Sequence, residues 1–322
     1  MYSLSLSNAF LDITLLANGA GLRDIRLKGH DHSLILGWAD DTDYFDDGAH
    51  MGAIAGPVAN RIAGGQLQNA AGTYELDRNE QGKHTLHGGI AGIGNQLWTL
   101  TKISTDMAIA SLFQPDGYGG FPGNRHFHVI YALQDSDLHL YISASTDKHS
   151  WCNLTPHPYF NLDGTQDFRH HHLQINARHY LPVREDNIPT GEIADVTGSR
   201  FDFRDKTALH DFATGRQPPI DNNFSLLDHQ TQTGFRDVAT LSSEKSGIEM
   251  QIATDQPGLQ LYFGQSLPAD KPGLNGQIIA PFAGLCLEPQ GWPDAPNHAH
   301  FPAIELSPER PYASHSCFRF RG

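Results

Sequence analysis

Short runs in which apolar and polar residues alternate recur along this chain, and they limit its possible folds more than any other feature. In residues 138–144 (LHLYISA), every second side chain is apolar, so the apolar side chains share one face and the polar ones the other. The same pattern occurs in residues 11–15, 127–131 and 248–252. Alternation with a period of two is typical of half-buried β-strands.

Between these runs lie clusters of turn-forming residues, such as residues 115–120 (PDGYGG) and 270–276 (DKPGLNG). No amphipathic helix of three turns or more is predicted. The 32 glycines and 19 prolines are spread evenly, so no linker marks a domain boundary. We therefore predict an all-β fold, a large antiparallel β-sandwich with few short helices, as a single domain over residues 1–322.

The charge balance narrows the possible partners. The chain has 22 Lys and Arg against 36 Asp and Glu, which gives a net charge of −14. Such a chain has no electrostatic footprint for nucleic acid or for an anionic membrane. A neutral ligand rich in hydroxyl groups would be indifferent to this charge, and for most of the acidic residues the simplest interpretation is that they keep the protein soluble.

The three cysteines, Cys152, Cys286 and Cys317, lie far apart and have neither metal-type spacing nor the density of a disulfide framework. A reducing compartment follows as the default. The first residues lack a basic segment and already alternate like a strand, so we expect no signal peptide. No stretch approaches the ~18 apolar residues of a membrane span. We expect a cytoplasmic protein, as a monomer or a homodimer.

Four segments differ from ordinary strand or turn sequence, because polar side chains stand beside Gly, Pro or aromatic residues. Such composition suits the rigid wall of a cleft, although each segment alone is weak evidence. They are residues 58–65 (VANRIAGG), 85–89 (TLHGG), 153–162 (NLTPHPYFNL) and 286–297 (CLEPQGWPDAPN).

Glu288 and His157 are candidates for acid–base chemistry. Glu288 follows an apolar strand end, where burial raises the basicity of a carboxylate, although a carboxylate capping the turn before Pro289 explains the local sequence better. His157 lies between two prolines, and imidazole changes charge near neutrality. A packed structural histidine is an equally good interpretation of His157, and a better one of His87, which precedes two glycines.

Asn60 and Arg61 offer forked donors for hydroxyl oxygens, although such a pair is common on surfaces. Asp221 could accept hydrogen bonds from two neighbouring hydroxyls, but its Asp-Asn-Asn context indicates a turn more strongly. Trp292 could stack on a sugar face, although a core or rim tryptophan is the simpler interpretation.

Two further patterns do not indicate sites. Consecutive histidines at 170–172 would point to opposite faces of a strand, so they cannot easily share one metal ion. The glycines of residues 117–123 are not followed by Lys-Ser/Thr or by a predicted helix, so phosphate binding is unsupported.

Taken together and in this order, the four segments resemble the aldose 1-epimerase (galactose mutarotase) family. They match its ANRI, LHGG, NLTNHSYFNL and LETQ…PDAPN motifs, and the DGxxGFPG loop, FDFR and PGLQ stretches match as well. The resemblance covers the chain from about residue 11 to residue 320. It implies a twisted β-supersandwich with a sugar cleft and with neither a metal nor an organic cofactor.

The resemblance also implies residue roles. Glu288 would be the base that removes the anomeric hydroxyl proton, and His157 the acid that protonates the ring oxygen. The other positions would bind the sugar: Asn60, Arg61 and His87 at the ring-oxygen and anomeric side, and Asp221 and Gln260 at the ring hydroxyls. The chain departs from the family pattern at Pro57, Pro156 and Pro158, which puts its substrate preference in doubt.

The sequence therefore predicts an isomerase that interconverts the α and β anomers of a free hexose or related aldose. Two alternatives stay open. A non-catalytic carbohydrate-binding or sugar-sensing protein would retain the cleft, but would not need a proton-transfer pair. A hexose-6-phosphate epimerase would need a basic cluster at the far end of the cleft, which the low Lys and Arg content disfavours.

Overall fold

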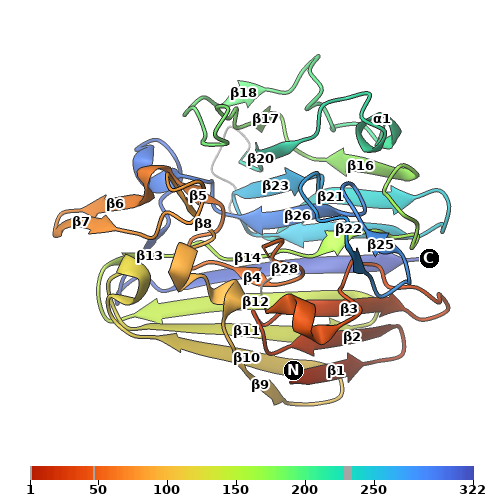
Figure 1. The fold of residues 1–322 in the computed structure, drawn as a ribbon, viewed down its shortest axis with the longest axis horizontal. Coiled ribbons are helices and arrows are strands. Elements are labelled where there is room, and N and C mark those ends of the chain that lie inside the picture. The colour runs from red at the N-terminus through yellow and green to blue at the C-terminus, as the bar shows by residue number, and fades with distance from the viewer. Residues whose placement is uncertain (1, 46–47, 228–233) are drawn as a thin grey trace.

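β-Strands make up almost all of the regular structure, as the alternating runs predict (Figure 1). The structure is a computed structural model that describes residues 2–45, 48–227 and 234–322. Over these ranges the structure has one α-helix, α1 (His210–Ala213), of four residues. The described part of the chain contains no helix with the length and apolar character needed to cross a membrane. In the described residues, six short 3₁₀ segments join the strands: Asp41–Tyr44, Ala63–Gly65, Gly89–Ala91, Ile93–Asn95, Tyr118–Gly120 and Ala295–Asn297.

A nine-stranded antiparallel sheet forms one layer of the molecule. The C-terminal strand β28 lies inside this sheet, between β22 and β12, so it joins strands from distant parts of the sequence. In spatial order the strands are β19 (Thr207–Ala208), β16 (His171–Ile175), β21 (Arg236–Ser243), β22 (Glu249–Thr254), β28 (Tyr312–Arg321), β12 (Asp137–Thr146), β11 (Arg125–Gln134), β10 (Met107–Gln114) and β9 (Thr99–Lys102).

Two smaller sheets pack against the nine-stranded sheet through one apolar core to which all three contribute. Phe160 of β15 and Phe318 of β28, for example, lie with ring centroids 5.3 Å apart. One small sheet contains β1 (Ser3–Ser7), β2 (Leu11–Leu16) and β3 (Leu22–Leu27). The other contains β15 (Tyr159–Phe160), β26 (Leu285–Gln290), β23 (Gly258–Tyr262), β20 (Asp221–Ser225), β17 (His179–Tyr180) and β18 (Ala194–Asp195).

The predicted alternation is confirmed in the strands, because the four runs lie largely within β2, β11, β12 and β22. In β12, Leu138, Leu140 and Ile142 are buried in the core, whereas Tyr141 is 42% exposed on the opposite face. The predicted all-β, antiparallel sandwich is therefore the observed architecture.

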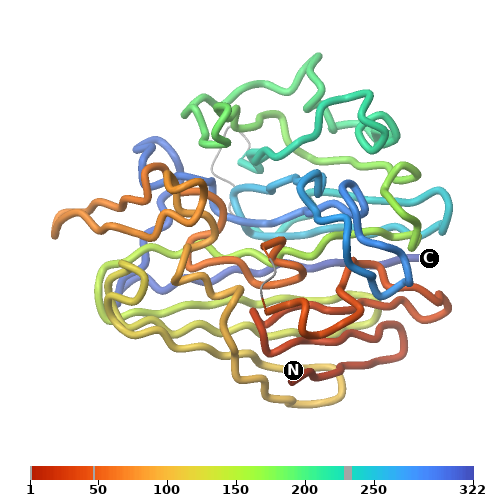
Figure 2. Tube along the Cα trace, viewed as in Figure 1, coloured from red at the N-terminus to blue at the C-terminus, as the bar shows by residue number. Residues whose placement is uncertain are grey.

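Short strand pairs connect the layers. A hairpin of β6 (Gln66–Asn69) and β7 (Gly72–Glu75) projects from the side of the molecule, as the orange trace in Figure 2 shows. At its base, β5 (Arg61–Ile62) pairs with β8 (Thr85–Leu86). The remaining pairs are β4 (Ile54–Ala55) with β14 (Thr155–Pro156), β13 (Ser150–Trp151) with β27 (Glu305–Leu306), and β24 (Lys271–Pro272) with β25 (Ile278–Ile279).

Candidate active site

The six-stranded sheet has two unlike faces. Leu285 and Leu287 of β26 belong to the apolar core, so the alternate residues Cys286 and Glu288 face the other way. Glu288 lies directly opposite Gln260 of β23 in the strand register, and directly opposed side chains share a face. The register of β26 and β23 therefore places a carboxylate and an amide side by side on the face turned away from the core.

Asp221 reaches the same face from β20, where it pairs with Tyr262 of β23. Gln260 donates a hydrogen bond from Nε2 to Asp221 Oδ1 over 2.6 Å. Three neighbouring strands thus place Glu288, Gln260 and Asp221 on one face of the sheet.

His157 reaches Glu288 from a different part of the chain. It follows β14, and its backbone N–H donates to the carbonyl of Ala53 beside β4 over 2.9 Å. His157 Nε2 lies 3.6 Å from Glu288 Oε1. The two groups, 131 positions apart in the sequence, therefore meet as the predicted acid–base pair requires.

Burial perturbs both members of this pair. Glu288 is 2% exposed, and burial, together with the nearby carboxylate of Asp221, raises its pKa well above the usual range despite the opposing charge of Arg61. Its Oε2 has no hydrogen-bond partner among the described residues. Burial lowers the pKa of His157 to about 3. Burial therefore disfavours the charged form of both side chains.

Two more histidines stand beside His157. The ring centroids of His87 and His157 are 5.4 Å apart, and those of His50 and His87 are 4.6 Å apart. Burial lowers the pKa of His50 to about 4, and burial lowers that of His87 well below its usual value, with the other two imidazoles and Arg61 adding to the effect. His87 Nδ1 accepts the backbone N–H of Asn60 at 3.2 Å, which leaves Nε2 as the nitrogen that carries a hydrogen.

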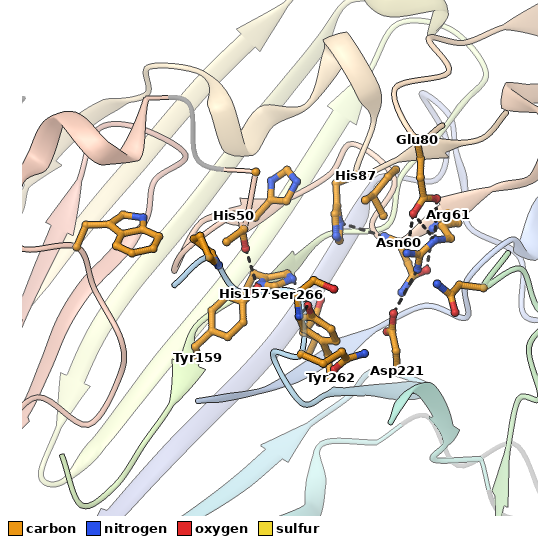
Figure 3. Close-up of a pocket in the computed structure, with 18 of the residues that line it drawn as sticks. His50, Asn60, Arg61, Glu80, His87, His157, Tyr159, Asp221, Tyr262 and Ser266 are labelled. Atoms are coloured by element: carbon orange, nitrogen blue, oxygen red, sulfur yellow. Dashed lines mark hydrogen bonds and ion pairs between the residues drawn. The ribbon is translucent and has the colours of Figure 1, made fainter. Parts of the chain in front are cut away.

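Arg61 and two carboxylates form a second wall of the pocket, which adjoins the first at Asp221, and Figure 3 shows Arg61 between Glu80 and Asp221. Its Nε and Nη2 bind Glu80 as a fork, with the shortest contact at 2.7 Å. Its Nη1 lies 3.6 Å from Asp221 Oδ2. Burial raises the pKa of Asp221, whereas Arg61 and the hydrogen bond from Gln260 oppose the shift.

The pocket between these walls has a volume of about 610 Å³, which is enough for a monosaccharide. Six of the seven predicted residues line it: Asn60, Arg61, His87, His157, Asp221 and Glu288. Gln260 lies behind Asp221 and lines a small adjoining hollow instead.

Several lining residues were not predicted from the sequence, notably His50, Glu80 and Tyr262. No pattern in the local sequence distinguishes Glu80 from a surface carboxylate. One structural signal marks part of the site, because Asn60, His87 and His50 all have positive φ, at 61°, 49° and 53°. Non-glycine residues in this conformation cluster at functional sites.

The simpler interpretations hold for the other patterns. Trp292 packs in an apolar cluster beside Phe301 and donates from Nε1 to the carbonyl of Pro257. His171 is buried against Asp163, whereas His172 contacts Glu244, so these neighbours do not share one site. Beside the pocket, the buried Cys286 forms a group with the lining residues His157 and Glu288, in which three potential metal-ligand atoms lie within 4.8 Å of one another.

Known proteins resemble this chain along nearly its whole length. The aldose 1-epimerase family model matches residues 2–319. Galactose mutarotase from Homo sapiens is 33% identical, over 98% of this chain and 92% of its own length. Aldose 1-epimerase from Escherichia coli K12 is 34% identical, over 98% of this chain and 93% of its own length.

Solved structures match along the whole chain. The aldose epimerase homologue from C. elegans superposes with a TM-score of 0.92 at 30% identity, covering 99% of this chain and 98% of that one. Galactose 1-epimerase from Lactobacillus acidophilus superposes with a TM-score of 0.85 at 28% identity, covering 99% and 94%. With its motifs in order along a matching sandwich, this chain belongs to the aldose 1-epimerase family and is an isomerase.

Proposed function

We propose that Glu288 and His157 interconvert the α and β anomers of a free aldohexose, such as galactose or glucose, by opening and reclosing the ring. The observation that supports this role is the 3.6 Å approach of the carboxylate to the imidazole inside a pocket of monosaccharide size. A positioned acid or base contributes about 10²–10⁴-fold to such a reaction.

The reaction needs two proton transfers in each direction. Glu288 takes the proton of the anomeric hydroxyl, the bond from C1 to the ring oxygen breaks, and the ring oxygen takes a proton from His157. The free aldehyde rotates about its C1–C2 bond. When the ring closes on the other face of the carbonyl, His157 takes back the proton and Glu288 returns one to O1.

The perturbed pKa values fit a pair that holds one shared proton. Burial raises the pKa of the Glu288 carboxyl and lowers that of His157 to about 3, and both shifts favour the arrangement in which the proton is on Glu288. The sugar hydroxyl donates a hydrogen bond to the carboxylate and so favours its charged form, which moves the shared proton to His157. The net charge of the pair does not change. Activity should therefore fall at high pH, when the pair loses this proton, and at low pH, when it gains a second one.

The remaining residues would hold the sugar. Arg61 and the Nε2 hydrogen of His87 can donate to ring or anomeric oxygens, and Asn60 stands beside them. Asp221 can accept from ring hydroxyls, and Gln260 keeps the Asp221 carboxylate in position.

The charges in the pocket favour a neutral sugar over a sugar phosphate. Among the described lining residues, both cations are paired with a carboxylate, Arg61 with Glu80 and Lys271 with Asp43 at 2.9 Å. A phosphate would have to compete with these acids for the same donors.

Polarimetry tests the proposal directly. Freshly dissolved α-D-galactose and α-D-glucose should reach anomeric equilibrium faster with the protein than in buffer, and the 6-phosphates should gain much less. Saturable binding of these sugars without any acceleration would contradict the proposal and favour a sugar-binding protein. Preferential acceleration of the 6-phosphates would instead favour a hexose-6-phosphate epimerase.

A further inference from the structure

A group of potential metal ligands lies on the outer face of the nine-stranded sheet, where β12 and β28 pair. His139 and Cys317 are directly opposite each other in the register, and Asp137 is two residues from His139 on the same strand. Their neighbours Leu138 and Phe318 are buried in the core, so alternation places these three side chains on the face turned away from it. The group is therefore separated from the sugar pocket by the core of the sandwich.

The ligand atoms are close to the spacing that a zinc ion needs. Cys317 Sγ lies 3.7 Å from Asp137 Oδ2 and 3.9 Å from His139 Nε2, and all three ligand atoms lie within 4.8 Å of one another. Tetrahedral Zn²⁺, with bonds of about 2.3 Å to sulfur and about 2.0–2.1 Å to nitrogen and oxygen, separates its ligand atoms by about 3.5 Å. We propose that Asp137, His139 and Cys317 bind Zn²⁺, with water as the fourth ligand.

A second histidine orients the first. His139 Nδ1 lies 3.1 Å from His315 Nε2, so an Nδ1–H donated to His315 leaves His139 Nε2 as an unprotonated nitrogen on the side of Cys317. Zinc-binding histidines are held by such a hydrogen bond from their other nitrogen. His315 is itself stacked between Tyr141 and Phe235, with ring centroids at 4.2 Å and 4.1 Å. The imidazole is therefore held in the orientation that a metal ligand needs.

Arg319 is the competitor for this site. Its Nε lies 3.3 Å from Asp137 Oδ2, while its Nη1 hydrogen-bonds with Asp237. A cation that binds Asp137 must displace the guanidinium from this carboxylate, but Arg319 keeps a second carboxylate partner. Without metal, Arg319 therefore neutralises part of the negative charge of Asp137, and metal binding replaces one cation at this carboxylate with another.

A bound ion would join two parts of the sheet. Strand β28 connects the β12 side of the nine-stranded sheet to the β22 side, and the ion would link it to β12 by side-chain bonds as well as by the backbone ladder. A ligand that binds the folded chain alone stabilises it by mass action. Zn²⁺ should therefore raise the melting temperature of the protein, and this expectation does not depend on the proposed epimerase reaction.

Titration of metal-free protein with Zn²⁺ by calorimetry, and with Co²⁺ by absorption, tests the site. The pocket group of His157, Cys286 and Glu288 is a rival that also contains a thiol, so Cys286→Ser separates the two sites. Wild type and Cys286→Ser should bind one equivalent of metal and show the cysteinate-to-cobalt charge-transfer band. Cys317→Ser should lose the band and weaken binding by about 100-fold or more, with His139→Ala weakening it comparably.

The matched control is Cys152→Ser, since Cys152 is buried away from both groups and should bind metal like wild type. A wild-type protein without the charge-transfer band would overturn the proposal, as would a band that disappears in Cys286→Ser and persists in Cys317→Ser. A zinc-induced rise in melting temperature that survives Cys317→Ser would also contradict it.

Arg319→Gln gives an independent test. Removing the competing cation should raise the Zn²⁺ affinity by roughly tenfold, because a positive charge a few ångströms from a divalent ion is removed. An unchanged or weaker affinity would overturn the assignment of Asp137 as a ligand.

Discussion

The two walls of the sugar pocket differ in how fully their buried charged side chains are paired. On one wall, Glu288 has an oxygen without a hydrogen-bond partner among the described residues and faces a neutral imidazole. On the other wall, Arg61 is bound by Glu80 as a fork and faces Asp221. The first wall is therefore ready to exchange a proton, whereas the second is a fixed set of donors and acceptors.

This difference separates reactivity from recognition. A buried carboxylate without a full complement of partners is costly to ionise, and that cost makes it a stronger base. A charged pair whose members satisfy each other holds its geometry. Variants on the two walls should therefore affect different kinetic quantities.

Replacing the base should have the largest effect. Glu288→Gln keeps the shape of the side chain but cannot accept the anomeric proton, so turnover should fall by about 10²–10⁴-fold. The melting temperature should stay the same or rise, because an incompletely paired buried acid is removed. Polarimetric turnover and thermal melting check both effects.

Glu305→Gln, in the exposed position of β27, is the matched control and should leave turnover unchanged. Near-normal turnover in Glu288→Gln would show that a different group is the base. The assignment of reactivity to the wall that contains Glu288 would then be wrong.

Replacing the acid should have the next largest effect. His157→Asn removes the proton donor to the ring oxygen, and turnover should fall by about 10²-fold. The loss should be smaller than that of Glu288→Gln, because the ring of His87, 5.4 Å away, can partly supply a proton. The measurement is turnover at saturating sugar.

His171→Asn is the matched control, because it also replaces a buried histidine by asparagine. His171 is also fully buried, but it accepts the backbone N–H of Leu162 and lies outside the sugar pocket. It should lower the melting temperature while keeping turnover. Equal losses of turnover in both variants would mean that a general loss of packing, rather than proton transfer, explains the effect.

On the recognition wall, Glu80→Gln should raise KM by about tenfold and change turnover much less. The substitution removes the charged partner of the Arg61 fork, and a hydrogen bond to a charged group contributes about 1.5–3 kcal/mol. Glu75→Gln, which breaks the exposed pair of Glu75 with Arg78 outside the pocket, should change neither constant. A fall in turnover with unchanged KM would show that Glu80 contributes to the chemical step rather than to sugar binding.

The smallest effect concerns stability against pH. The folded-state pKa of His50 is lowered to about 4, so below the unfolded value of about 6.5 the unfolded chain takes up a proton first. Stability should therefore fall as the pH falls from about 6.5 towards 4, by about 1.4 kcal/mol per pH unit for this residue. His87 and His157 act in the same direction.

His50→Gln should make this acid slope shallower by about 1.4 kcal/mol per pH unit, as measured by denaturant unfolding between pH 6 and pH 5. His126→Gln, at an exposed position of β11, should leave the slope unchanged. An unchanged slope in His50→Gln would show that His50 is charged in the folded protein.

The sequence predicted the sandwich because alternation is a local property. Residues 138–144 carry their inward and outward faces in the order of their side chains, and β12 follows that order. The collinear motifs predicted the family and its acid–base residues, and the structure brings Glu288 and His157 together. Gln260 was predicted to bind ring hydroxyls, whereas the structure places it behind Asp221.

Tertiary structure decided what depends on register and on contacts between distant segments. No local pattern joins Glu80 to Arg61, or His50 to His87, because these contacts depend on how short strands and left-handed backbone positions meet at the pocket. The same holds for Cys317 and His139, which become neighbours when β28 inserts beside β12. A sequence by itself determines which face each side chain takes on its strand, whereas the pairing of strands decides which faces meet, because register is set by the whole sheet.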